Sequence, residues 1–258
     1  MKKIGLMMLG ITGCFVLAGC QSWGNSSYEE KQYENTGNVQ SLEINDDNMK
    51  INVVGVDDDQ PLTINYHESE YETYKISEQG NKVSMKKQNR SRGWNIFSFF
   101  NWNFDDIELT VEVPKDQLKN LNITTKNGKI VVEGLTVKES RLKTTNGSLL
   151  VEDFRATDIL KLETTNGKVE LSDVQVKEGQ IETTNAKINF DQLVIEDSFK
   201  AETTNGKIRG TIEGSQKDFE IESKTTNGDN NLENSGTGSK KLKLKTTNGS
   251  VRVDFSKD

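Results

Sequence analysis

Reactive side chains are scarce in this sequence. It contains two cysteines, Cys14 and Cys20, and one histidine, His67. Nucleophilic catalysis by serine or cysteine needs a general base, most often a histidine, within hydrogen-bond reach. Cys14 lies inside an apolar N-terminal run, and Cys20 ends that run. At Cys20 we expect acylation of the thiol, as described below, rather than catalysis. The sequence therefore predicts neither a histidine triad nor a thiol enzyme.

Carboxylates are plentiful, but they recur in a regular row. Glu163, Glu182 and Glu202 stand 19 and 20 residues apart. This predicts a solvated stripe, whereas hydrolysis of a polysaccharide needs a converging acid and base. The acidic clusters 57–59 and 105–106 lack the spacing of a calcium loop. We expect no catalytic residue, no metal and no cofactor, and keep a β-helical carbohydrate-active enzyme as the alternative function.

The N-terminus has the pattern of an export signal. Two lysines precede an apolar run that is too short to span a bilayer as a helix. The run ends in Leu17-Ala18-Gly19-Cys20, which resembles the bacterial lipobox. This resemblance implies that residues 1–19 are a signal peptide and that the thiol of Cys20 receives a diacylglyceryl group. No disulfide is then expected, because Cys14 leaves with the signal and Cys20 is acylated.

Residues 20–36 combine the lipidated cysteine with a polar, aperiodic stretch that predicts a flexible tether. Each buried methylene of an acyl chain contributes about 0.8 kcal/mol, so two or more chains would hold the protein firmly. We expect an extracytoplasmic protein anchored to the cell membrane, on the outer face of the cytoplasmic membrane in a Gram-positive cell.

A sevenfold repeat fills residues 117–258. Its mark is Thr-Thr-Asn-Gly, which recurs in full or altered form every 19 to 22 residues. A period near 20 residues is typical of a solenoid. The seven repeat asparagines are Asn127, Asn146, Asn166, Asn185, Asn205, Asn227 and Asn248.

The residues around each asparagine alternate with a period of two. The fourth and sixth positions before it and the third and fifth after it hold 23 apolar residues in 28 places, whereas the positions between them hold 2 in 28. This alternation predicts strands with one buried face. A further apolar pair follows in the first four repeats, as at Phe154 and Ala156. We therefore predict an all-β fold, a single β-solenoid of roughly triangular coils whose strands stack at about 4.8 Å.

The Asn-Gly pair predicts the corner of each coil. Glycine permits positive φ, which turns the chain into the next strand. The asparagine side chain can bond nearby backbone groups or the asparagine one coil away. Seven asparagines in register predict an internal amide ladder, which we interpret as structural rather than as a ligand-binding row.

Residues 37–116 are also β-rich but lack the Asn-Gly corner. Alternating runs at 42–44, 51–53 and 107–113 predict strands. We interpret this part as irregular first coils or an N-terminal cap, because the terminal units of repeat proteins are atypical.

An aromatic segment, residues 86–106, interrupts this part and predicts a long hairpin loop. Its rings and basic side chains suit insertion into a membrane interface beside anionic headgroups, or contact with a partner. The alternative is that the rings cap an open end of the solenoid. The residues concerned are Trp94, Phe97, Phe99, Phe100, Trp102, Phe104, Arg90 and Arg92.

The formal net charge is −7, which disfavours nucleic acid as a partner. One column of lysines lies two residues after the asparagines and could follow an anionic wall polymer. The preferred interpretation is a solvated face. The column is Lys129, Lys168, Lys187 and Lys207.

The β-rich lead-in, the Val-Glu-Val-Pro strand at 111–114 and the Leu-x-x-Leu-x-Ile-x-Thr-x-Asn-Gly-x-Ile-x-Val repeats resemble the bacterial putative-adhesin family over about residues 38–255. This resemblance implies a β-helical envelope protein of unknown function, with some relatives linked to envelope stress signalling, and it supplies no catalytic residues. We expect a non-enzymatic, lipid-anchored envelope scaffold that contacts an envelope protein or an anionic wall polymer.

Overall fold

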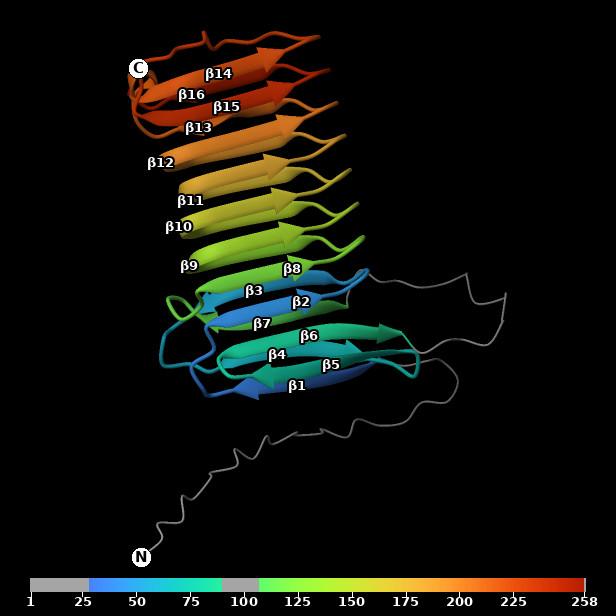
Figure 1. Ribbon diagram of the computed structural model, residues 1–258. Coiled ribbons are helices and arrows are strands. Elements are labelled where there is room, and N and C mark those ends of the chain that lie inside the picture. Colours follow the sequence, from blue (N-terminus) through green and yellow to red (C-terminus); the bar gives the residue numbers. More distant parts are fainter. Residues whose placement is uncertain (1–27, 90–106, 258) are drawn as a thin grey trace, which may run out of the picture.

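The computed structural model describes residues 28–89 and 107–257, which form strands, turns and one short 3-10 turn (Figure 1). The all-β prediction is confirmed. Cys20 and the aromatic and basic residues between Arg90 and Phe104 lie outside the described residues. Within the described ranges, no helix has the length and apolar character to cross a membrane.

Parallel strands stack in register through the repeat region. Leu149, for example, pairs with Ile130 on one side and Val169 on the other. Each coil, meaning one turn of the stack, therefore lies on the coil before it, and the arrangement is solenoid-like. The strands concerned are β8 (Asn120–Thr124), β9 (Ile130–Lys143), β10 (Leu149–Glu163), β11 (Val169–Glu182), β12 (Ile188–Thr203) and β13 (Ile208–Ile212).

Each complete coil is one long bent strand rather than the three short strands that the pattern predicts. β10 bends at Asp153, which has a φ of 45°, and β11 bends at Asp173, which has a φ of 52°. The ladder to the next strand shifts register after Ala156. β10 therefore pairs with its neighbours in three stretches, at 149–152, 154–156 and 159–163. The three predicted inward faces are present within one continuous strand.

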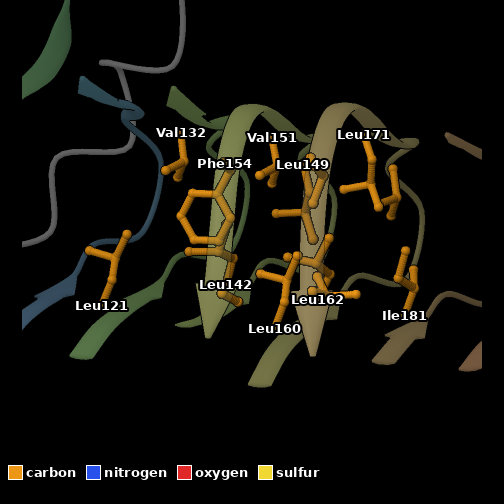
Figure 2. Packing of buried hydrophobic residues seen from close by; sticks show 14 of the residues in the cluster. Leu121, Val132, Leu142, Leu149, Val151, Phe154, Leu160, Leu162, Leu171 and Ile181 are labelled. Atoms are coloured by element: carbon orange, nitrogen blue, oxygen red, sulfur yellow. The ribbon is translucent and has the colours of Figure 1, made fainter. Parts of the chain in front are cut away.

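The interior is a narrow apolar column in which equivalent side chains stack. Figure 2 shows Leu142, Leu162 and Ile181 at equivalent places of successive coils. Large and small side chains complement one another between neighbouring coils. A Cβ atom added at Gly179 would lie 2.4 Å from Cδ2 of Phe199, so the ring fills the space that the glycine leaves. Phe199 also meets Phe190 edge to face, with ring centroids 5.5 Å apart.

The last two repeats stack out of sequence order. β15 (Lys240–Thr246) pairs with β12 and also with β14 (Phe219–Thr225), and β16 (Val251–Phe255) pairs with β13. The seventh repeat therefore lies directly on the fifth, and β14 of the sixth repeat is the outermost strand, as Figure 1 shows. The C-terminal end therefore departs from a solenoid whose coils stack in sequence order.

Polar residues at two positions of the sixth repeat explain this order. Ser223 and Asn230 occupy places that are apolar in better repeats, and there they bond each other, Ser223 Oγ donating to Asn230 Oδ1 at 2.9 Å. Asn231 covers the edge of β16, because its side-chain amide bonds the backbone N and O of Val253 at 3.0 and 2.9 Å. Such a repeat is suited to cover an end rather than to lie between two coils.

The N-terminal part mixes parallel coils with antiparallel strands. β2 pairs in parallel with β6 and β8, and β3 pairs in parallel with β7 and β9. β1 and β5 are outermost, each paired antiparallel, to β4 and β6 respectively. The strands are β1 (Glu29–Asn35), β2 (Ser41–Asn45), β3 (Lys50–Val56), β4 (Leu62–Glu68), β5 (Glu72–Gln79), β6 (Lys82–Asn89) and β7 (Glu108–Pro114).

Two predicted boundaries in this part are wrong. The predicted tether, 20–36, is too long because Glu29–Asn35 form β1. This strand shows little alternation, since Tyr33 is its one buried residue, and it is held by backbone pairing to β4. The aromatic segment starts later than residue 86, because β6 extends to Asn89.

The connection from β6 to β7 is also not a hairpin. The two strands do not pair with each other; β6 lies on β2, and β7 lies on β3. β6 and β7 therefore take the places in their coil that β2 and β3 hold in the next coil.

The conformation of the corner glycines differs from the expectation. Among the described glycines, positive φ occurs at Gly80, Gly134 and Gly214, so the expectation of positive φ at the Asn-Gly corner is wrong. Glycine is needed there for close approach, since a Cβ atom at Gly167 would lie 1.6 Å from the carbonyl oxygen of Gly147.

Gly167→Ala should lower the free energy of unfolding by about 1–3 kcal/mol in urea titration, because the coils must separate locally. The cost is limited because Ala186 holds this place in the fourth corner. Gly236→Ala is the control, since nothing lies within 4 Å of its added Cβ. Equal stabilities of the two variants would contradict the close-approach explanation.

Candidate binding surface at the asparagine corner

A buried threonine closes each regular corner. Thr164 Oγ1 accepts a hydrogen bond from the backbone N of Gly167 at 3.2 Å and donates to the carbonyl oxygen of Gly147, one coil away, at 3.1 Å. Thr144 makes the equivalent bonds, accepting from Gly147 at 3.1 Å and donating to Gly128 at 3.2 Å. These hydroxyls satisfy backbone groups that would otherwise be buried without partners.

The repeat asparagines form a hydrogen-bonded column, here called the Asn ladder. Asn146 Nδ2 donates to Asn127 Oδ1 at 2.7 Å, and Asn166 Nδ2 donates to Asn146 Oδ1 at 2.7 Å. The same bond, at 2.8 Å, joins Asn185 to Asn166 and Asn205 to Asn185. All of these side chains are exposed. The prediction of an internal ladder is therefore wrong, because the threonine two residues earlier takes the inward direction.

The ladder follows the spatial order of the coils. Asn248 donates to Asn205, and Asn227 donates to Asn248, both at 2.8 Å. Asn227 is thus the terminal residue of the ladder at the β14 end, although Asn248 comes later in the sequence.

Sequence reasoning missed an eighth member, Asn48. Asn127 Nδ2 donates to Asn48 Oδ1 at 2.7 Å. Asp46 replaces the buried threonine at this corner, and its Oδ1 accepts from the backbone N of Asn48 and of Met49, both at 2.7 Å. The available signal was Asp46-Asp47-Asn48 between two alternating runs, since aspartate accepts the same turn bonds as threonine.

Beside the ladder runs a shallow groove of about 380 Å³. Outward threonines, one residue before five of the asparagines, line it together with the glutamate row and lysines. It follows several coils, so its surface repeats along the stack. The lining residues that carry this pattern are Thr145, Thr165, Thr184, Thr204, Glu163, Glu182, Glu202, Lys143 and Lys245.

Lysines and an amide lower the pKa of two groove carboxylates. Glu163 lies between Lys161 and Lys143, at 2.7 and 2.9 Å, and both bonds lower the pKa of its carboxyl. The pKa of Glu182 is also lowered, first by the Gln180 amide and then by Lys200 at 3.3 Å. The groove therefore presents a compensated row of charges.

The other candidate residues lie away from this groove or form regular outer columns. Lys168, Lys187 and Lys207 are exposed on the far side of the ladder, and Lys168 pairs with Glu170 at 2.8 Å. His67 lies on β4, opposite Glu30 of β1. In residues 28–89 and 107–257, no group of three His, Cys, Asp or Glu side chains is arranged to hold a metal ion.

The family profile described as Toastrack DUF4097 matches residues 39–258, which cover every coil and the whole Asn ladder. The chain belongs to this family. The resemblance to adhesin-like β-strand-repeat proteins is thereby confirmed, while the Toastrack family name itself states no activity. A comparison with curated proteins finds no match.

Several solved structures are similar to this Toastrack chain. A putative cell adhesion protein from Clostridium sporogenes ATCC 15579 is 10% identical, with a TM-score of 0.40, and covers 89% of this chain and 100% of its own. A putative adhesin from Parabacteroides merdae ATCC 43184 is 12% identical, with a TM-score of 0.40 and coverages of 90% and 98%. One from Bacteroides fragilis NCTC 9343 is 12% identical, with a TM-score of 0.39 and coverages of 89% and 98%.

Substitutions of Asn166 test whether the Asn ladder needs an uncharged amide that both donates and accepts. Asn166→Ala should lower the free energy of unfolding by about 0.5–1.5 kcal/mol, because water can replace the lost bonds at this exposed site. Asn166→Asp should cost more at neutral pH, because a carboxylate cannot donate to Asn146 Oδ1. Protonation restores a donor, so the deficit of the aspartate variant relative to wild type should shrink as pH falls. Urea titrations from pH 7 to pH 4 measure this, and a pH-independent deficit would contradict the ladder geometry.

The lowered pKa values of two groove glutamates predict that the stability of the fold decreases at acidic pH. The pKa of Glu163 and of Glu182 lies below the ordinary value of 4.5 in the fold, so their ionised form stabilises the protein above that pH. This stabilisation is lost as pH falls through the folded-state pKa.

Glu163→Gln with Glu182→Gln should therefore cost about 0–1 kcal/mol per ion pair at pH 7 and flatten the loss of stability below pH 4.5. Glu152→Gln is the control, since Glu152 is exposed and makes no ion pair within the described part of the chain. Thermal unfolding over this pH range is the measurement, and parallel pH curves for the double variant and wild type would be the opposing result.

Proposed function

We propose that this Toastrack protein is a non-enzymatic scaffold, anchored to the cell membrane through a lipidated Cys20, that presents its stacked coils to an envelope protein or an anionic wall polymer. The polarity of the stack carries the proposal. β1 lies at one end of the stack and β14 at the other (Figure 1). Cys20 precedes β1 by nine residues, which span at most about 30 Å when extended. An anchor at Cys20 therefore places the β1 end next to the bilayer and directs the Asn ladder and groove away from it.

The position of the aromatic segment supports the same orientation. Its flanking strands, β6 and β7, pair with β2 and β3 near the β1 end. Rings and basic side chains between these strands start from the part of the molecule that the anchor holds near the lipid. We propose that Trp94, Phe99, Phe100 and Trp102, with Arg90 and Arg92, contact the membrane interface there.

The charge state of the groove favours a scaffold over a polysaccharide-cleaving enzyme. Hydrolysis of a glycosidic bond needs one carboxyl with a raised pKa as the acid and one ionised carboxylate. Glu163 and Glu182 both have a lowered pKa, because lysine side chains and the Gln180 amide donate hydrogen bonds to their carboxylates. The geometry suits recognition of an extended partner along the coils, and an envelope-stress signalling role is compatible with such recognition.

Two variants test the proposal in cells. Cys20→Ser should abolish metabolic labelling with palmitate and release the protein from the membrane fraction. Replacement of residues 90–106 by a Gly-Ser linker keeps β6 and β7 whole, so it should leave palmitate labelling intact while reducing photocrosslinking of the protein to membrane lipid.

The wild-type chain and a Lys168→Ala variant, which changes the opposite side of the ladder, are the controls. Palmitate labelling of the Cys20→Ser chain, or its full retention in the membrane fraction, would overturn the anchor. Equal crosslinking to lipid with and without residues 90–106 would overturn the role of the aromatic segment.

A further inference from the structure

Six of the repeat asparagines are followed by glycine, a pair with its own chemistry. When the glycine nitrogen loses its proton, it can attack the asparagine Cγ. A bond forms between that nitrogen and Cγ, the bond from Cγ to Nδ2 breaks, and ammonia leaves. Water then opens the resulting succinimide at either carbonyl and yields aspartate or isoaspartate. Glycine favours the attack because it has no side chain to hinder approach.

The corners at Asn146 and Asn166 restrain both groups that this reaction needs. The backbone N–H of Gly147 is bound to Thr144 Oγ1 at 3.1 Å, and that of Gly167 is bound to Thr164 Oγ1 at 3.2 Å. The Asn166 side chain is held on both sides, donating to Asn146 and accepting from Asn185. Its backbone N bonds Thr145 O at 2.9 Å. Cyclisation would have to break these bonds together.

The corner at Asn227 lacks part of this restraint. Its Nδ2 donates to Asn248, but within the described residues its Oδ1 accepts no hydrogen bond, because no coil lies beyond β14. Thr225 is half-buried, whereas the inward threonines of the other corners are buried. Its Oγ1 donates to Gly249 O at 2.6 Å and makes no bond with the backbone N of Gly228, a bond that is also missing at Gly206 and Gly249.

We propose that Asn227-Gly228 is the site at which the folded protein deamidates first, and that the Asn ladder protects the inner Asn-Gly pairs. An aspartate at 227 has no amide to donate to Asn248 Oδ1. Asn248 then becomes the terminal member of the ladder, so deamidation advances inward one coil at a time from the β14 end. The number of deamidated asparagines in the ladder therefore increases with the age of the folded chain.

Peptide mapping by mass spectrometry tests this on the full chain. The folded protein is kept at pH 8, and a sample is kept in urea at the same pH. We expect the folded chain to form aspartate and isoaspartate at Asn227 roughly tenfold or more faster than at Asn146 or Asn166, since each hydrogen bond that must break slows the reaction severalfold. In urea the six Asn-Gly pairs should react at similar rates. Asn185, which precedes Ala186, is the internal control and should be slower than they are in urea.

The variant Asn227→Asp separates a ladder effect from general exposure. It should raise the deamidation rate at Asn248 while leaving that at Asn146 unchanged, and circular dichroism should confirm that it folds. Thr164→Val removes the acceptor of the Gly167 N–H and should raise the rate at Asn166 alone. Equal rates at Asn227 and Asn166 in the folded chain, or an unchanged rate at Asn248 in Asn227→Asp, would overturn the proposal.

Discussion

The structure depends on one constraint: chemically equivalent side chains must lie on top of one another at the spacing of neighbouring parallel strands. At about 4.8 Å, a side chain contacts its own counterpart in the next coil before it contacts anything else. Aliphatic residues meet this condition by stacking in the interior. Threonine meets it by linking one coil's glycine N–H to the previous coil's glycine C=O, and asparagine meets it with an amide that both donates and accepts.

The same constraint explains why glycine follows asparagine. At the corners the backbones of successive coils approach so closely that a Cβ atom at Gly147 would lie 1.8 Å from the carbonyl oxygen of Gly128. It also explains the C-terminal order. A repeat with polar residues at positions that are apolar in other repeats, such as Ser223 and Asn230, satisfies them locally, so it suits the end of the stack better than the middle. The better seventh repeat, with Leu242, Leu244, Val251 and Val253 buried, therefore lies inside it.

Much of this could be predicted from the sequence, because the repeat multiplies a weak local signal sevenfold. Period-two alternation identified the strands, and the buried face is the one that Leu160 and Leu162 occupy. That the asparagines point outward could not be predicted from the sequence. Threonine and asparagine are both polar and stand two residues apart, and only the geometry of the corner decides which of them points inward. The eighth member, Asn48, was hidden because Asp46 does the work of threonine with a different side chain. Pairing order was likewise hidden, because strand propensity carries no information on which coil is the neighbour.

A surface of this kind differs from an enzyme cleft in how it could recognise a partner. Its groups repeat along one axis instead of converging on one point, so contacts accumulate with the length of the partner. The Asn ladder, the outward threonines and the ion-paired glutamates form three parallel columns on one edge of the stack. An extended or repetitive partner would meet the same groups at each coil.

The most direct test of coil-on-coil stacking is disulfide crosslinking across the ladder, in a chain whose Cys14 and Cys20 are replaced by serine. Cysteines at 205 and 248 should lie about one strand spacing apart, within the Cα separation that a disulfide accepts. Cysteines at 205 and 227 should lie about twice as far apart, beyond that range. We predict a rapid intramolecular disulfide for the first pair and none for the second. Crosslinking of 205 with 227, and not with 248, would contradict it.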